Sequence, residues 1–306
     1  MKKSKLSRFI RFCSIIVFSI WVIHITGINY DLSNSNSAIS ATPSVLNTVH
    51  TPSKKPKPPT TASPEASLNV LMEKLNLTAI GANSGGSSGG QINEISCWSV
   101  GNCVIGGAYY FGPLGGGNTA FLAQETNGQW GQAFLVPTTA NFSSYLQGDD
   151  YSDATWVDCP AKGYCSVGGS YNDNLNAICE SCYTNAFVVN EVKGKWYGAI
   201  AVPGVHALNQ GDGADLEVGT CLSVGTCEIG GTYTDNSGNT QLYTDSEKNG
   251  IWQIAKPLGD YNGSNSTSFN TMQCSTPQRC EATGTYGYNN FVAILKNGRW
   301  RFVSSK

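Results

Sequence analysis

The chain has 306 residues, of which 13% are charged, and its formal net charge is −2 at pH 7. From residue 66 to the C-terminus there are 11 Lys and Arg residues against 19 Asp and Glu residues, so this part carries a net charge of −8. A phosphate backbone needs a positive surface, and this balance therefore argues against nucleic acid as a partner.

Residues 1–41 have the features of an export segment. Lys2, Lys3, Lys5, Arg8 and Arg11 precede an apolar stretch at 12–28 that has no formal charge. Its length lies between that of a cleaved signal peptide and that of a membrane-spanning helix, so a cleaved signal and a retained N-terminal apolar helix both stay open. In either case we expect the rest of the chain to be extracellular, secreted or anchored to the cell membrane by this segment.

Residues 42–67 are rich in Pro, Thr, Ser and Lys and include Lys54-Lys55-Pro56-Lys57-Pro58-Pro59. A segment of this composition cannot bury enough apolar surface to fold, and its prolines keep it extended. We therefore expect a disordered linker. Residues 68–90 form a short lead-in segment, which fits either a short helix or a strand.

Residues 91–306 contain one motif four times. Each copy has two cysteines separated by five residues, then a Gly-Gly-x-Tyr or related stretch, and later a Gly-x-Trp turn; the cysteine pairs are Cys97 and Cys103, Cys159 and Cys165, Cys221 and Cys227, and Cys274 and Cys280. The fourth copy departs most, with Thr283-Gly284 in place of Gly-Gly. A period of this length indicates a repeat architecture, with copies at about 91–153, 154–216, 217–270 and 271–306.

Every copy resolves into four short runs rich in β-formers and bounded by Gly, Asn, Asp or Pro. The third and fourth runs meet at turns that need positive φ, namely Asn127-Gly128, Lys193-Gly194, Asn249-Gly250 and Asn297-Gly298. Three tight hairpins followed by a long crossover predict one antiparallel four-stranded blade for each copy. The expected fold is thus all-β, a four-bladed β-propeller, with the Trp after each turn packed between blades.

Export also determines how the cysteines are interpreted. Besides Cys13 there are ten, in the four pairs named above and in Cys179 and Cys182. In an oxidising compartment an even number of closely paired cysteines indicates disulfides. Zinc is the alternative, but structural zinc sites use shorter Cys spacings or added histidines, and this region has a single histidine, His206.

The repeats, written Cys-x5-Cys-x2-Gly-Gly-x-Tyr, then Ala-Phe, then Asn-Gly-x-Trp, resemble those of secreted repeat proteins of bacteria, actinobacteria especially. The resemblance covers residues 91–306. It implies a propeller-like extracellular domain and carries no particular activity or catalytic residue with it.

Two acids before the cysteines are candidates for catalysis. Glu94 lies three residues before Cys97, and Asp158 lies one residue before Cys159, so strand alternation is expected to turn both to one face. Two facing carboxylates suit glycoside hydrolysis, so the alternative function is a secreted glycan-active hydrolase. Glu217, four residues before Cys221, has the other parity and is set aside. Acids at such positions also commonly cap strand ends or lie exposed.

The crossover loops are the candidate ligand-binding surface, because propeller loops gather on one face of a rigid scaffold. They are rich in Tyr, Asp and His, and the candidate residues are Tyr145, Asp149, Asp150, Tyr151, His206, Asp212, Asp215, Asp260 and Tyr261. Tyrosine rings stack on sugars and carboxylates accept hydroxyl protons, while clustered Asp can also bind Ca²⁺. Turns use these same residue types. We predict a surface-exposed module that binds a glycan or a protein without catalysis and without a required cofactor; a passive structural surface protein is the remaining alternative.

Overall fold

The computed structural model describes residues 75, 89–110, 118–138, 151–172, 184–211, 213–259 and 266–303. The chain divides into two compact units, 1–52 and 53–306, and all described residues belong to the second. The export segment, the linker, most of the lead-in segment and the Cys179 and Cys182 pair lie outside the described residues. Within the described ranges, no helix is long and apolar enough to cross a membrane.

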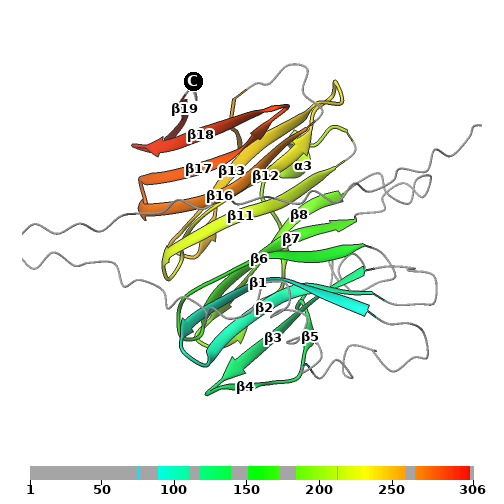
Figure 1. Ribbon diagram of the computed structural model, residues 1–306, viewed down its shortest axis with the longest axis vertical. Coiled ribbons are helices and arrows are strands. Elements are labelled where there is room, and N and C mark those ends of the chain that lie inside the picture. Colours follow the sequence, from blue (N-terminus) through cyan, green and yellow to red (C-terminus); the bar gives the residue numbers. More distant parts are fainter. Residues whose placement is uncertain are drawn as a thin grey trace, which may run out of the picture. The chain divides into compact units, whose positions relative to one another are not determined.

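Four antiparallel sheets follow one another along the chain (Figure 1). The first sheet consists of β1 (Gly89–Ser99), β2 (Asn102–Tyr110), β3 (Asn118–Thr126), β4 (Gln129–Trp130) and β5 (Phe134–Leu135). The second consists of β6 (Ser152–Ala161), β7 (Tyr164–Asn172), β8 (Thr184–Val192), β9 (Lys195–Trp196) and β10 (Ile200–Ala201).

The third sheet consists of β11 (Ala214–Ser223), β12 (Thr226–Thr234), β13 (Thr240–Lys248), β14 (Ile251–Trp252) and β15 (Lys256–Pro257). The fourth consists of β16 (Thr267–Thr276), β17 (Arg279–Tyr286), β18 (Asn289–Lys296) and β19 (Arg299–Val303). A single turn of helix, α3 (Val205–Leu208), lies between the second and third sheets. The predicted fourth run of each copy is thus two short strands in the first three sheets and one continuous strand in the last.

The predicted hairpin turns are confirmed by their backbone. Asn127, Lys193, Asn249 and Asn297 all have φ between 51° and 56°, and the glycine after each of them has φ between 73° and 80°. Two successive residues of positive φ are what a two-residue turn of the right twist requires. Three of the four first positions hold asparagine, which tolerates this conformation better than most residues.

The first strands of the sheets, β1, β6, β11 and β16, pack side by side in that order. Each space between neighbouring sheets is filled by its own apolar cluster. Phe187, Leu216 and Leu242 are fully buried members of the first, second and third of these clusters. In the second, third and fourth sheets, the Trp after the hairpin turn packs on the cluster that its sheet shares with the preceding one: Trp196, Trp252 and Trp300. The rear of the first sheet is buried as well, with Leu75 of the lead-in segment in its cluster.

We call the side of each sheet that turns toward the next sheet its forward face. In the first three sheets this face holds the first glycine of the Gly-Gly pair, and the next sheet comes very close to it. A Cβ on Gly106, Gly168 or Gly230 would lie 2.5–2.8 Å from a side-chain carbon of the following sheet. The fourth sheet has Thr283 at this position, and its forward face is exposed at Thr271, Gln273 and Glu281. The fourth copy therefore departs from the motif on a face against which no described sheet packs.

The second glycine of the pair is kept in all four copies for a different reason. A Cβ on Gly169 would lie 1.8 Å from the carbonyl oxygen of Asp153 on the neighbouring strand of the same sheet. Gly107, Gly231 and Gly284 face equivalent carbonyls at 1.9–2.1 Å. Because this approach occurs within one sheet, it does not depend on a following repeat.

Four disulfides close the hairpin between the first two strands of each sheet, at Cys97–Cys103, Cys159–Cys165, Cys221–Cys227 and Cys274–Cys280. These are the pairs that the spacing predicts. Four disulfides in one domain are typical of extracellular or secreted proteins.

Candidate functional site

A bulge interrupts the first strand of every sheet at the same place, four residues before the first cysteine. The register shifts lie between Ile92 and Glu94, Ala154 and Trp156, Leu216 and Val218, and Phe269 and Thr271. A bulge re-aims the side chain of its extra residue. In the first three sheets that side chain, from Asn93, Thr155 or Glu217, reaches the backbone of the next first strand.

Glu217 is the acid among these bulged residues. Its Oε2 accepts a hydrogen bond of 2.6 Å from the backbone N–H of Phe269, and its Oε1 lies 3.5 Å from the Thr232 hydroxyl. Strict strand alternation predicts that Glu217 points to the other face from Glu94 and Asp158. That prediction is wrong because the bulge between Leu216 and Val218 re-aims its side chain. Burial is the main reason why the pKa of Glu217 is raised, to about 7.

Two further acids lie at the start of the first strands, Asp215 near Glu217 and Asp153 near Asp215. Asp153 on β6 and Asp215 on β11 both stand six residues before the first cysteine of their copy. Burial raises both pKa values, that of Asp153 to about 6, and repulsion from Asp215 adds to the rise at Asp153. The Asn93 amide donates a hydrogen bond to Asp153, and Ser170 is hydrogen-bonded to Asp215. We call Asp153, Asp215 and Glu217 the acidic cluster.

Tyrosines surround the acidic cluster. Tyr151 is 38% exposed, its hydroxyl is hydrogen-bonded to Ser170, and burial with the nearby charges of Asp153 and Asp215 raises its pKa to about 12. Tyr243 lies fully buried beneath the cluster, and its hydroxyl has no hydrogen-bond partner among the described atoms. The site therefore combines one accessible aromatic ring with three carboxyl groups that keep their protons up to higher pH than usual.

The structure brings two of the predicted ligand-binding residues together, Tyr151 and Asp215, since the Asp215 charge is close enough to add to the rise in the Tyr151 pKa. His206 lies on α3, where its side chain is exposed. The other candidates, Tyr145, Asp149, Asp150, Asp212, Asp260 and Tyr261, lie outside the described residues. Sequence reasoning missed Asp153, although its place six residues before the first cysteine matches that of Asp215 and offered a signal.

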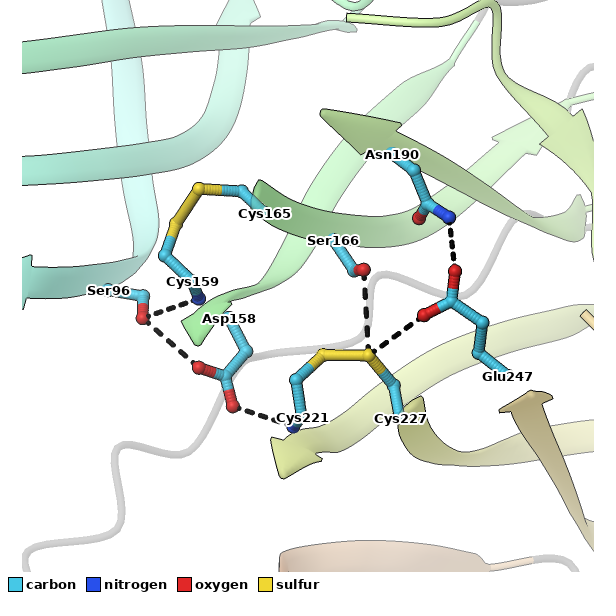
Figure 2. Close-up of a disulfide and its surroundings, with 9 residues drawn as sticks. All are labelled: Ser96, Asp158, Cys159, Cys165, Ser166, Asn190, Cys221, Cys227 and Glu247. Carbon is cyan, nitrogen blue, oxygen red and sulfur yellow. Dashed lines mark hydrogen bonds between the residues drawn. A yellow bond between two sulfur atoms is a disulfide. The ribbon is translucent and has the colours of Figure 1, made fainter. Parts of the chain in front are cut away.

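The two acids of the hydrolase alternative lie in different surroundings. Glu94 is exposed on β1, whereas Asp158 is buried between three sheets. The Ser96 hydroxyl donates a hydrogen bond of 3.3 Å to one oxygen of Asp158, and the other oxygen accepts the backbone N–H of Cys221 at 2.8 Å (Figure 2). Ser96 in turn accepts the backbone N–H of Cys159, at 3.0 Å. Asp158 thus links neighbouring sheets, and both of its oxygens already have partners.

A second buried acid lies beside a disulfide. The Glu247 side chain is 2% exposed, and its Oε2 lies 3.2 Å from Cys227 Sγ while its Oε1 accepts from the Asn190 amide (Figure 2). A disulfide sulfur carries no proton, so a hydrogen bond between these atoms requires a protonated Glu247 as donor. Burial raises the pKa of Glu247, which favours that form. This end of the second and third sheets also lines a half-open pocket of about 190 Å³.

No group of three or more His, Cys, Asp or Glu side chains within the described ranges is arranged to hold a metal ion. The acidic cluster is therefore not a preformed cation site as it stands. What it can do is accept and donate hydrogen bonds, since each carboxyl group titrates closer to neutral pH than a solvated one.

Comparisons with known proteins give structural similarity alone. No protein family and none of the curated proteins matches the chain. Among solved structures, the Hadza microbial sialidase Hz136 aligns with a TM-score of 0.48 and 12% identity over 67% of this chain and 44% of its own. A protein of unknown function from Dyadobacter fermentans aligns at 0.44 and 11%, covering 69% of each chain. A neuraminidase-like protein from A/bat/Guatemala/164/2009 aligns at 0.39 and 13%, over 68% of this chain and 52% of its own. The chain thus spans about half the length of the sialidase and of the neuraminidase-like protein.

Proposed function

We propose that the four sheets are blades of a propeller-type array, and that this array is an exported module which binds a neutral glycan at Tyr151 and the acidic cluster. The exposed ring of Tyr151 supplies a stacking surface for a sugar, and Asp153 and Asp215 supply hydrogen-bonding groups beside it. The four disulfides support an oxidising compartment.

One observation carries the proposal: the fold does not require acids at this place. The positions equivalent to Asp153 and Asp215 hold Gln91 in the first sheet and Ser268 in the fourth. The two acids are nevertheless largely buried near one another, and their raised pKa values mean that ionising them there is unfavourable. A feature that costs stability and that the repeat can do without is typical of a binding site.

Binding is favoured over hydrolysis because these acids are already hydrogen-bonded within the protein. Glu217 accepts from Phe269, Asp153 accepts from Asn93, and Asp158 is held by Ser96 and Cys221. A catalytic pair needs one carboxyl group free to protonate the leaving group and another free to face the sugar or a water.

The test is a glycan array probed with the full chain, in Ca²⁺ and again in chelator. We expect Tyr151→Ala to abolish the signal of any glycan that the wild type binds. Tyr197→Ala is the matched control, because Tyr197 is also an exposed tyrosine of the second sheet, 52% accessible and away from the cluster. A blank array, or equal loss in both variants, would contradict the proposal and favour a protein partner or a structural role. Loss of signal in chelator would assign a cation to the site.

A further inference from the structure

The forward face of the fourth sheet carries a row of positive charges. Arg279 on β17 lies opposite Lys296 on β18, and Lys296 lies opposite Arg299 on β19. Arg301 follows two residues later on the same face of β19. All four side chains are exposed, and three of them, Lys296, Arg299 and Arg301, line a hollow of the surface. We call these four residues the cationic row.

The charge of the fourth sheet is opposite to that of the other three. Residues 266–303 hold the four members of the cationic row and one acid, Glu281, which gives a net charge of +3. Residues 89–259 hold five Lys and Arg residues against sixteen Asp and Glu residues, a net charge of −11. Repeats of the same fold therefore differ sharply in charge, and the positive charges gather on the face that no described sheet covers.

The fold does not require cations at these positions. The position of Arg299 holds Gln129, Lys195 and Ile251 in the other sheets, and the position of Arg279 holds Asn102, Tyr164 and Thr226. Like charges placed opposite each other on neighbouring strands destabilise a sheet. A row that costs stability and is absent from the other copies indicates a partner of opposite charge.

We propose that the cationic row binds a linear polyol-phosphate polymer of the cell surface. Neighbouring strands are about 4.8 Å apart and alternate residues of one strand about 6.6 Å apart, so the row presents its charges at the spacing of successive negative groups along a short-repeat polymer. Arginine suits this ligand because its guanidinium group matches a phosphate through two parallel hydrogen bonds. The surface is distinct from the acidic cluster and does not depend on the function proposed for it.

The same face argues against a nucleic acid as the occupant. Proteins that bind single strands without sequence preference combine a cationic groove with aromatic side chains on which the bases stack. Along the described part of this face, the register places only Thr, Ser, Gln, Glu, Asn, Val, Ile, Lys and Arg side chains, because Trp300 and Phe302 turn to the opposite side. A polymer without bases needs no such rings.

The experiment measures binding of a defined glycerol-phosphate oligomer to the full chain at increasing salt concentrations. Four phosphate contacts predict that the logarithm of the binding constant falls with the logarithm of salt with a slope of about −3. Arg299→Gln combined with Arg301→Gln should weaken binding about tenfold at low salt and reduce the slope to about −1.5.

Lys193→Asn combined with Lys195→Gln is the matched control, because Lys195 occupies in the second sheet the position of Arg299 in the fourth. It removes the same charge, and binding should stay at the wild-type level. The urea midpoint of both variants checks that they are folded. No binding by the wild type, or equal weakening in the two variants, overturns the proposal. Equal affinity for single-stranded DNA of the same charge, or for vesicles of anionic lipid, overturns the assignment to a polyol phosphate.

Discussion

The close approach of neighbouring sheets at the first glycine of each Gly-Gly pair gives a sharp test of the packing. In Gly168→Ala the new Cβ would lie 2.5 Å from Leu216 Cδ1 and 3.2 Å from both Leu216 Cδ2 and the Phe187 carbonyl oxygen. Leu216 is 1% exposed and has little room to move. Overpacking of this kind costs about 1–3 kcal/mol, and the gain from replacing a strand glycine returns about 0.5–1 kcal/mol. We expect a net loss of about 1–2 kcal/mol in the free energy of unfolding.

Two companion variants make the test specific. Gly169→Ala would meet the Asp153 carbonyl oxygen at 1.8 Å, and a backbone atom inside a sheet cannot turn away as a side chain can. It should therefore cost more than Gly168→Ala. Thr283→Val lies at the position equivalent to Gly168 in the fourth sheet, where no described sheet follows. It keeps the size of the side chain and removes only the exposed hydrogen bond of 2.7 Å between the Thr283 and Thr271 hydroxyls, so it should change stability by less than about 0.5 kcal/mol.

Urea unfolding of the oxidised chain, followed by tryptophan fluorescence, ranks these three variants. The expected order of loss is Gly169→Ala, then Gly168→Ala, then Thr283→Val. The reasoning is refuted if Gly168→Ala is neutral or stabilising. It is refuted equally if Gly169→Ala costs less than Gly168→Ala, because the backbone approach inside the sheet would then be less restrictive than the side-chain contact between sheets.

Four further outcomes follow from the structure. Asp158→Ala should cost about 2–3 kcal/mol in urea unfolding, because it strips partners from the buried Ser96 hydroxyl and Cys221 N–H, and it should leave ligand binding unchanged. Replacing Cys221 and Cys227 together by alanine should cost about 2 kcal/mol, the loop-closure value for so short a loop. Burial raises the pKa of Asp153 to about 6 and that of Glu217 to about 7, so the folded state binds more protons than the unfolded state between about pH 4 and pH 7. Stability should therefore fall as pH rises through this window, and Glu217→Gln should flatten that fall. A wild-type stability that rises with pH instead would contradict the assignment. Lys193→Asn should raise the thermal midpoint, gaining about 0.5–1 kcal/mol, because Lys193 has a φ of 56° where the other three sheets use asparagine.

The sequence predicted those parts of the fold that depend on local chemistry. Positive φ at Asn249-Gly250 and a hairpin closed by Cys221 and Cys227 both follow from residue type and spacing alone. The packing of Trp252 between sheets followed from the repeat, since a large apolar residue at a fixed place in every copy needs a neighbour.

The site was less predictable, because it depends on how neighbouring repeats meet. Strict alternation placed Glu217 on the wrong side of its strand, since no sequence pattern announced the bulge between Leu216 and Val218. Asp153 was overlooked because its importance comes from Asp215, which is distant in the sequence and brought close only when the second and third sheets pack. Thr283 departs from the Gly-Gly motif, and its reason became visible only in the structure, where no described sheet packs against this face.

Comparison between copies separates acids that serve the fold from acids that do not. Asp158 accepts the N–H of the first cysteine in the next sheet, and Ser96, its counterpart in the first sheet, does the same for Cys159. A serine can therefore replace this carboxylate, and the role is structural in both copies. Asp153 and Asp215 also have polar counterparts, Gln91 and Ser268, yet the two acids lie near one another and burial raises the pKa of each. Because the first and fourth sheets form with an amide or a hydroxyl at that position, the sheet does not require a carboxyl group there, and the carboxyl pair beside the accessible Tyr151 ring is the feature on which the proposed glycan site rests.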